Sequence, residues 1–405
     1  MKILIAGGGI GGLTAALLLH AAGFNDIEVL ESVPRIEPLG VGINLLPHSV
    51  RILDGLGLLP TLRDRGVETR ELIYFNKHGQ RIWTEPRGRH AGYDVPQISL
   101  SRGVLHMTLL ELALRRLGPE RVQTSHRVSG FEEQGGEIFV DVSATDGPRR
   151  LQGDILVGAD GIHSRIRKLL YPTEGEPIYS GRILWRAVSL ASPYLSAASM
   201  VMIGHRDQKF VAYPIQMPGS DGTQLINWIA ELASPRPDEV DWNSKVSIDK
   251  FMDPFAEWGF DWLNVPALIR SADAVYEYPL VDRNPLPRWT KGRVTLLGDA
   301  AHPMYPIGSN GASQAILDGQ ALTAALLAEQ DPEVALQRYE HERRKTTARI
   351  VIANRTDGPE VCMQIAEQRA PHGFTNIDEV IPRHELESIA AKYKAVAGFT
   401  PPSNL

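Results

Sequence analysis

The chain is poor in cysteine, with a single one, Cys362, in 405 residues. No disulfide can form within the chain, and a cysteine-based metal site is excluded. Positive charge is not in excess either: 48 acidic residues outnumber 42 lysines and arginines, and this balance argues against a nucleic-acid-binding protein. No apolar run reaches the ~20 residues of a membrane span, and a strand-like run beginning at residue 2 leaves no room for a signal peptide. We expect a cytoplasmic protein with neither a membrane nor a nucleic acid as partner.

Motifs for metal-dependent and hydrolytic chemistry are also missing. The sequence has no His-Glu-x-x-His pattern and no tight cluster of His, Asp and Glu, so no metal ligands are predicted. It has no Gly-x-Ser-x-Gly nucleophile elbow. His302, which is followed by a proline, is interpreted as structural. No catalytic side chain is therefore predicted.

What the sequence does contain is a complete dinucleotide-binding unit at its start. Gly7, Gly9 and Gly12 follow a short apolar run and open an Ala/Leu-rich helix, and Glu31 closes a second apolar run, 27–30. Gly7 permits a tight turn, Gly9 lets the backbone approach a pyrophosphate, and Gly12 allows close helix–strand packing. The helix N-terminus attracts phosphate, and Glu31 can accept hydrogen bonds from a ribose.

Two further glycine-marked segments follow apolar runs, one at 154–167 around Asp160 and one at 293–314 around Asp299. Ligands bind at the carboxyl ends of parallel strands, so we expect these segments to meet there. Asp299 is suited to ribityl or ribose hydroxyls, although a turn with an N-cap is the alternative. Asp160-Gly161 is either an ordinary turn or part of a cofactor site. Arg102 is either a pyrophosphate ligand or a surface arginine.

The predicted fold class is α/β: a Rossmann-type domain with an inserted, mostly antiparallel β-sheet domain and a helical C-terminal region. The inserted layer is rich in short strand-like runs, and its segment 183–278 holds five of the seven tryptophans. The charged stretch 341–345 is interpreted as a solvated helix face. The predicted boundaries are 1–71, 97–180 and 279–370 for the nucleotide-binding domain with its C-terminal helices, 72–96 and 181–278 for the inserted domain, and 371–405 for a C-terminal tail.

In order and spacing, the three segments resemble the family of FAD-dependent aromatic-ring monooxygenases with the para-hydroxybenzoate hydroxylase fold. The resemblance covers the chain from Met1 to about Arg369. Within the family, four stretches are most similar to the phenazine-1-carboxylate-type hydroxylases: 38–43, 157–164, 281–289 and 304–319.

This resemblance implies FAD as cofactor, NADH or NADPH as co-substrate, and hydroxylation of a small aromatic substrate by O2 through a flavin C4a-hydroperoxide. The residues expected at the flavin are Gly7, Gly9, Gly12, Glu31, Gly40, Val41, Gly42, Arg102, Asp160, Asp299, Pro303, Gly308, Asn310, Gly311 and Ala312. Those expected at the substrate are Trp185, Arg186, Tyr213 and Tyr305. Arg186 is a candidate for a substrate carboxylate.

Two other functions remain open from the sequence. A flavin-binding redox sensor or sequestering protein would share these motifs without turnover. A flavin-dependent halogenase would carry a Trp-x-Trp-x-x-Pro signature, which we do not find. The assembly is expected to be a monomer or a homodimer.

Overall fold

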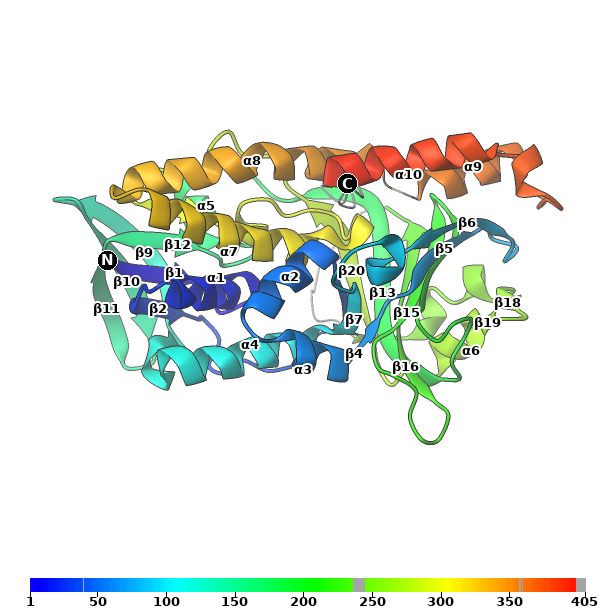
Figure 1. Ribbon diagram of the computed structural model, residues 1–405, viewed down its shortest axis with the longest axis horizontal. Helices are drawn as coiled ribbons and strands as arrows, with labels where there is room; N and C mark the ends of the chain where they lie inside the picture. The colour runs from blue at the N-terminus through cyan, green and yellow to red at the C-terminus, as the bar shows by residue number, and fades with distance from the viewer. Residues whose placement is uncertain (39, 236–244, 357, 359, 398–405) are drawn as a thin grey trace.

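The computed structural model describes residues 1–405 except 39, 236–244, 357, 359 and 398–405. A parallel sheet flanked by helices forms one end of the molecule and a large mixed sheet forms the other, while long C-terminal helices run along one side of both (Figure 1). This arrangement confirms the predicted fold class.

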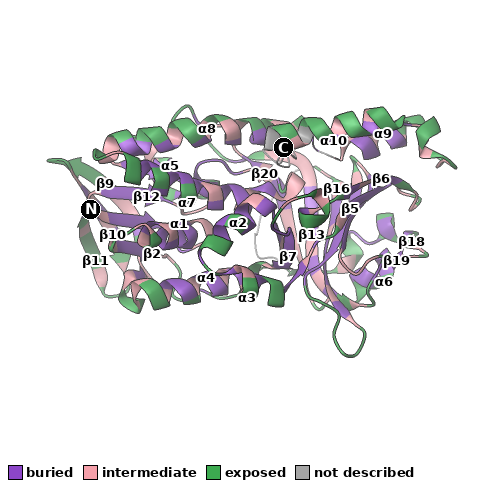
Figure 2. Cartoon of the chain, viewed as in Figure 1, coloured by how far each residue is buried: buried purple, intermediate pink, exposed green. Residues whose placement is uncertain are grey.

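The parallel sheet has the order β21-β12-β1-β2-β8 and is assembled from distant parts of the chain. Its strands are almost wholly apolar and buried (Figure 2), as expected of a sheet covered on both faces. They are β1 (Lys2–Ala6), β2 (Asp26–Leu30), β8 (Val122–Gln123), β12 (Ile155–Gly158) and β21 (Val294–Leu296). Because β1 pairs with β12, which pairs with β21, all three glycine-marked segments leave this sheet at its carboxyl edge.

Helices cover this sheet, and two separate, small antiparallel sheets belong to the same part of the molecule. The helices of this part are α1 (Ile10–Ala21), α2 (Pro47–Gly55), α3 (Leu59–Asp64), α4 (Arg102–Leu117), α5 (Arg165–Leu170) and α7 (Asn310–Ala328). One antiparallel sheet consists of β9 (Arg127–Gln134), β10 (Glu137–Ala144) and β11 (Gly147–Gly153). Another consists of β3 (Gly42–Leu45), β7 (Ile98–Ser101) and β4 (Gly66–Glu68).

The large sheet has eight strands in the order β17-β20-β13-β16-β15-β14-β5-β6. All neighbours are antiparallel except β14 and β5, in agreement with a mostly antiparallel inserted layer. The strands are β5 (Glu71–Phe75), β6 (Arg81–Pro86), β13 (Ile178–Ala191), β14 (Ser199–His205), β15 (Gln208–Pro214), β16 (Gln224–Ala233), β17 (Lys245–Val246) and β20 (Val275–Asp282). An aromatic cluster fills one face, together with α6 (Val265–Arg270) and the hairpin of β18 (Gly259–Phe260) and β19 (Leu263–Asn264).

The C-terminal region consists of α8 (Pro332–Thr356), α9 (Val361–Arg369) and α10 (Arg383–Ala397). The segment that we treated as a tail therefore contains a helix, and Leu386 of α10 packs in an apolar cluster with α9 and the large sheet. Among the described residues, no helix has the length and apolar character needed to cross a bilayer.

Candidate functional site

A cavity of about 380 Å³ lies between the carboxyl edge of the parallel sheet and one face of the large sheet. All three glycine-marked segments reach it, as the topology predicts. The predicted residues that line it are Gly9, Gly42, Arg102, Arg186, Tyr213, Asp299, Asn310, Gly311 and Ala312. The other predicted residues lie around it or elsewhere, as described below.

The glycines of the opening unit differ in what surrounds them. A Cβ on Gly7 would lie 2.3 Å from the carbonyl oxygen of Ala159, and one on Gly12 would lie 2.0 Å from that of Gly7. Gly7 also has a φ of +110°, a conformation that side chains disfavour. A Cβ on Gly9, by contrast, would meet nothing within 4 Å. Gly7 and Gly12 therefore allow close packing, whereas Gly9 borders open space at the start of α1.

The N-terminus of α1 is free to receive an anion. Its N-cap is Gly9, no side chain caps it, and its first turn carries no acid. Glu31 stands at the end of β2 outside the cavity lining, where its carboxylate accepts the N–H groups of Gly8 at 2.8 Å and Val33 at 2.9 Å. The backbone thus holds this carboxylate beside the glycine turn.

The loop that leads into β3 joins the two halves of the site. The Arg102 N–H donates to the carbonyl oxygen of Val41, and the backbone of Gly40, at a φ of +101°, lies against the Arg102 side chain. The Gly42 N–H donates to Oδ1 of Asn227 on β16, at 2.6 Å. Arg102 thereby faces the cavity from the start of α4, while Gly42 ties this loop to the large sheet.

The third glycine-marked segment forms another wall of the cavity. Asp299 is exposed to the cavity, whose walls keep it from bulk water, and this desolvation raises the pKa of its carboxyl. Gly308, at a φ of +66°, lies in the turn before α7, and Pro303 is buried outside the lining. No side chain caps α7 and its first turn has no acid, so its N-terminus at Gly311 offers a second positive end.

Sequence reasoning missed Asp318 and Arg343, which hold this segment in place together with His302. Asp318 of α7 is fully buried and accepts hydrogen bonds from the Gly298 N–H at 3.0 Å and from Nε of Arg343 at 2.8 Å. Nε2 of His302 lies 2.5 Å from Oδ2 of Asp318, which is the oxygen that also accepts the Gly298 N–H. The interpretation of 341–345 as a solvated face was wrong for Arg343, which is buried. The sequence feature that could have indicated this network is Asp318, an acid inside the otherwise apolar stretch of α7.

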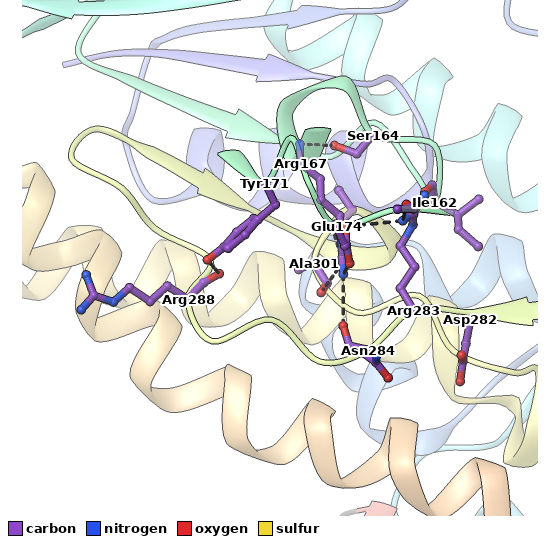
Figure 3. A network of polar contacts seen from close by, with 12 residues as sticks. Ile162, Ser164, Arg167, Tyr171, Glu174, Asp282, Arg283, Asn284, Arg288 and Ala301 are labelled. Atoms are coloured by element: carbon purple, nitrogen blue, oxygen red, sulfur yellow. Dashed lines mark hydrogen bonds and ion pairs between the residues drawn. The ribbon is translucent and has the colours of Figure 1, made fainter. Parts of the chain in front are cut away.

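A second network links the segment 154–167 to the segment 293–314, and Arg167 is its centre (Figure 3). From α5, its Nη1 donates to the carbonyl oxygens of Ala300 and Ala301 at 3.0 and 2.9 Å, while Glu174 pairs with its Nε and Nη2. Asp160 has a local role: it accepts the N–H groups of Arg165 at 2.7 Å and Ile166 at 3.2 Å, and it does not line the cavity. Asp160 thus holds the turn before α5 in place, its role at a cofactor stays a prediction, and Arg167 joins the second segment to the third.

On the substrate side, residues of the large sheet face the cavity in three rows across neighbouring strands. The first row pairs Tyr213 with Asn227, the second pairs Arg186 with Ile229 and Val211, and the third pairs Lys209 with Glu231. Met200, Met202 and Leu184 add apolar surface in these rows.

Two predicted substrate residues do not line the cavity. Trp185 lies on the opposite face of the sheet, because it precedes Arg186 in a strand and neighbouring side chains alternate. There it stacks on Phe251 and its Nε1 donates to Glu277 at 2.8 Å. Tyr305 packs against Leu184, which lines the cavity. The position of Trp185 on the far face corrects that expectation, and a substrate contact of Tyr305 stays a prediction.

Arg186 is the cationic group of the apolar middle row. Its guanidinium lies 6.0 Å from the ring centroid of Tyr278, and within the described part of the chain it has no acidic partner and its Nε has no hydrogen-bond partner. Burial lowers its pKa. Arg186 is half-buried on the cavity wall, and a desolvated cation without a counter-ion is costly, so this arrangement favours an anionic ligand. Nearby, burial raises the pKa of Tyr213 to about 12, so its hydroxyl stays protonated. No group of three or more metal-ligating side chains occurs among the residues described.

Comparisons with known proteins identify the family and the fold of the chain. The family profile described as FAD binding domain matches residues 1–354. Phenazine 1,6-dicarboxylic acid hydroxylase PhzS of Lysobacter antibioticus is 43% identical over 361 residues, which are 87% of this chain and 89% of that protein. 3-Hydroxybenzoate 6-hydroxylase 1 of Aquipseudomonas alcaligenes is 32% identical over 355 residues, 86% of each chain. Klebsiella pneumoniae HpxO, solved with FAD and uric acid, superimposes with a TM-score of 0.77 at 24% identity over 99% of this chain and 97% of its own.

Proposed function

Because the chain belongs to the FAD-binding-domain family of FAD-dependent aromatic monooxygenases, we propose that it hydroxylates an aromatic carboxylic acid with O2 and NADH or NADPH. The phenazine acid hydroxylase named above is the relative that suggests a fused-ring acid. The cavity accords with this, since apolar residues of the large sheet line it and Arg186, which has no acidic partner among the described residues, stands in its middle row.

The observation that carries the proposal is Arg186. Its guanidinium is enclosed, and no described acid neutralises it. An arginine fork pairs well with a carboxylate, and such charge-assisted hydrogen bonds are about twice as strong as neutral ones. An aromatic acid would satisfy the guanidinium and place its ring against Val211 and Ile229 of the same row.

The residues present fit FAD. The open space at Gly9 and the uncapped α1 N-terminus suit a pyrophosphate, with Arg102 as a further cation, and Glu31 and Asp299 offer carboxylates for hydroxyl groups. When bound, FAD supplies hydride acceptance and oxygen activation. The chain itself binds and orients both partners, and the apolar residues of the large sheet exclude water from the cavity.

The test is a comparison of an acid with its neutral analogue. Phenazine-1-carboxylate should stimulate NADH or NADPH oxidation and yield a hydroxylated product by mass spectrometry. Arg186→Met should raise the KM for this acid about tenfold or more, since a charged hydrogen-bonding partner is lost. The KM for phenazine-1-carboxamide should change little.

Two outcomes would contradict the proposal. An equal loss for acid and amide would make Arg186 a structural residue. Tight binding of the acid with no oxidation of either nicotinamide cofactor and no product would favour the sensor or sequestering function instead.

A further inference from the structure

Three consecutive glycines, Gly7, Gly8 and Gly9, form the turn between β1 and α1. Glycine has no side chain to restrict its backbone, so the peptide planes of such a turn rotate easily unless hydrogen bonds fix them. An anion site at the start of a helix needs N–H groups that already face the ligand. The residues that fix these peptides therefore contribute to the site.

Hydrogen bonds hold the peptides of this turn one by one. The Gly8 N–H donates to Glu31 at 2.8 Å, and the carbonyl oxygen of Gly9 accepts the N–H of Leu13 at 2.9 Å. The peptide between Gly8 and Gly9 has one anchor among the residues that the structure describes, and this anchor is His106. Its Nε2 lies 2.6 Å from the carbonyl oxygen of Gly8.

The anchor comes from helix α4. His106 follows Arg102 by four residues, so the two side chains share one face of the helix, and α4 packs against α1. A carbonyl oxygen can only accept a hydrogen bond, which means that Nε2 of His106 carries a hydrogen and donates to Gly8. The imidazole is half-buried, and its hydrogen bond links the first turns of α4 to the glycine turn.

This hydrogen bond sets the direction of the Gly9 N–H. In a planar trans peptide, the C=O and the N–H that follows it point to opposite sides. Because the Gly8 carbonyl is directed at His106, the Gly9 N–H is directed away from it, and this N–H has no acceptor within the described ranges. Gly9 lines the cavity and borders open space, whereas neither Gly8 nor His106 lines it.

We propose that His106 is a positioning residue for FAD: by holding the Gly8 carbonyl, it keeps the Gly9 N–H directed at the pyrophosphate. Without this hydrogen bond the glycine peptide rotates freely, and its N–H has to be reoriented whenever FAD binds. A preorganised binding group avoids that cost, so loss of the donor weakens the hold on the pyrophosphate. The inference depends on FAD as the cofactor and not on the identity of the substrate.

The test compares His106→Leu with His106→Gln in FAD titrations of the apoprotein. A glutamine amide places an N–H near the position of Nε2, whereas leucine has no donor. His106→Leu should weaken FAD binding about tenfold, as expected for one lost hydrogen bond to a charged group, and His106→Gln should stay within about threefold of wild type. In the phosphorus NMR spectrum of bound FAD, the leucine variant should move a pyrophosphate resonance toward its position in free FAD.

His78→Leu is the matched control. Nε2 of His78 also lies 3.0 Å from a carbonyl oxygen, that of Pro371, but neither residue lines the cavity. This variant should leave FAD affinity and the phosphorus spectrum unchanged. Wild-type FAD affinity in His106→Leu would overturn the proposal, and so would equal losses in the leucine and glutamine variants. A lower Tm of His106→Leu with an unchanged phosphorus spectrum would make His106 a merely structural residue.

A measurement on the wild-type protein keeps the test independent of how well the leucine variant folds. With isotope-labelled histidine, the nitrogen NMR signals of His106 are identified by their absence from the spectrum of His106→Gln. In the FAD-loaded protein, the neutral ring should carry its hydrogen on Nε2, because this atom donates to the Gly8 carbonyl. A ring that carries its hydrogen on Nδ1 could not make this hydrogen bond and would refute the assignment.

Discussion

Replacing Asp318 by asparagine tests whether the buried network behind the Gly298 turn holds the cofactor segment in place. The substitution keeps the shape of the side chain and an acceptor for the Gly298 N–H, but it leaves the Arg343 guanidinium buried without its carboxylate. Breaking a buried ion pair in this way costs about 3–5 kcal/mol. With an unfolding entropy of roughly 2.1 cal/mol/K per residue over a chain of this length, the expected fall in Tm is about 4–6 °C.

The pH dependence of this loss follows from the ionisation of Asp318. Burial by itself would raise the pKa of Asp318, but the charges of His302 and Arg343 outweigh it and lower the pKa to about 2. The carboxylate therefore stabilises the fold above about pH 4 and loses this effect as the pH falls toward 2, a contribution of roughly 2.5 kcal/mol. The gap in Tm between wild-type and Asp318→Asn protein should be constant from pH 7 to about 4 and narrow below that.

The assay combines thermal unfolding with FAD titration of the apoprotein. Asp318→Asn should lower both Tm and FAD affinity. The matched control is Asp282→Asn, since Asp282 is also buried and is paired with Arg355 at 2.7 Å, but its hydrogen bonds go to that arginine and not to the Gly298 turn. This control should lower Tm and spare FAD affinity. A Tm for Asp318→Asn within a degree of wild type, or equal FAD losses in both variants, would refute the reasoning.

Two further predictions concern glycines and the lone cysteine. Gly9→Ala should fold with a wild-type Tm but weaken FAD binding about tenfold or more by filling space for the pyrophosphate, whereas Gly12→Ala should lower Tm because its Cβ would lie 2.0 Å from a carbonyl oxygen. Unfolding curves and FAD titrations separate the two, and a destabilised Gly9→Ala would contradict the open space seen there. Cys362 is buried and its pKa is raised by that burial, so a thiol reagent should label it only after denaturation. Rapid labelling of the native protein would contradict its position.

The nucleotide-binding part was predictable because local rules fix it. The spacing of Gly7, Gly9 and Gly12 indicates a tight turn, room for a pyrophosphate and a close helix–strand contact, and this spacing is visible within six residues of sequence. Asp299 followed from its place at the end of an apolar strand, because parallel strands end at one edge of their sheet. These inferences need only the chain direction and the steric properties of glycine.

The substrate side was harder because it depends on the parity of strands and on distant partners. Trp185 and Arg186 are neighbours in β13 and cannot both face one cavity, so only one of the two expectations could hold. Which face is buried against aromatic residues is decided by strands and helices far along the chain. Lys209 and Arg343 look like surface cations in sequence, and their acids, Glu360 and Asp318, lie 151 and 25 residues away.

The order of the parallel sheet also bears on how the protein is made on the ribosome. The first strand of the chain lies beside β12, and that strand lies beside β21, whose residues are numbered in the 290s. At about 5–20 residues per second, translation leaves the N-terminal strand without its full set of neighbours for many seconds. Contacts of such high sequence separation form slowly because loop closure precedes them. The three glycine-marked segments therefore cannot meet at the edge of the sheet before β21, nearly three quarters of the way along the chain, has been synthesised.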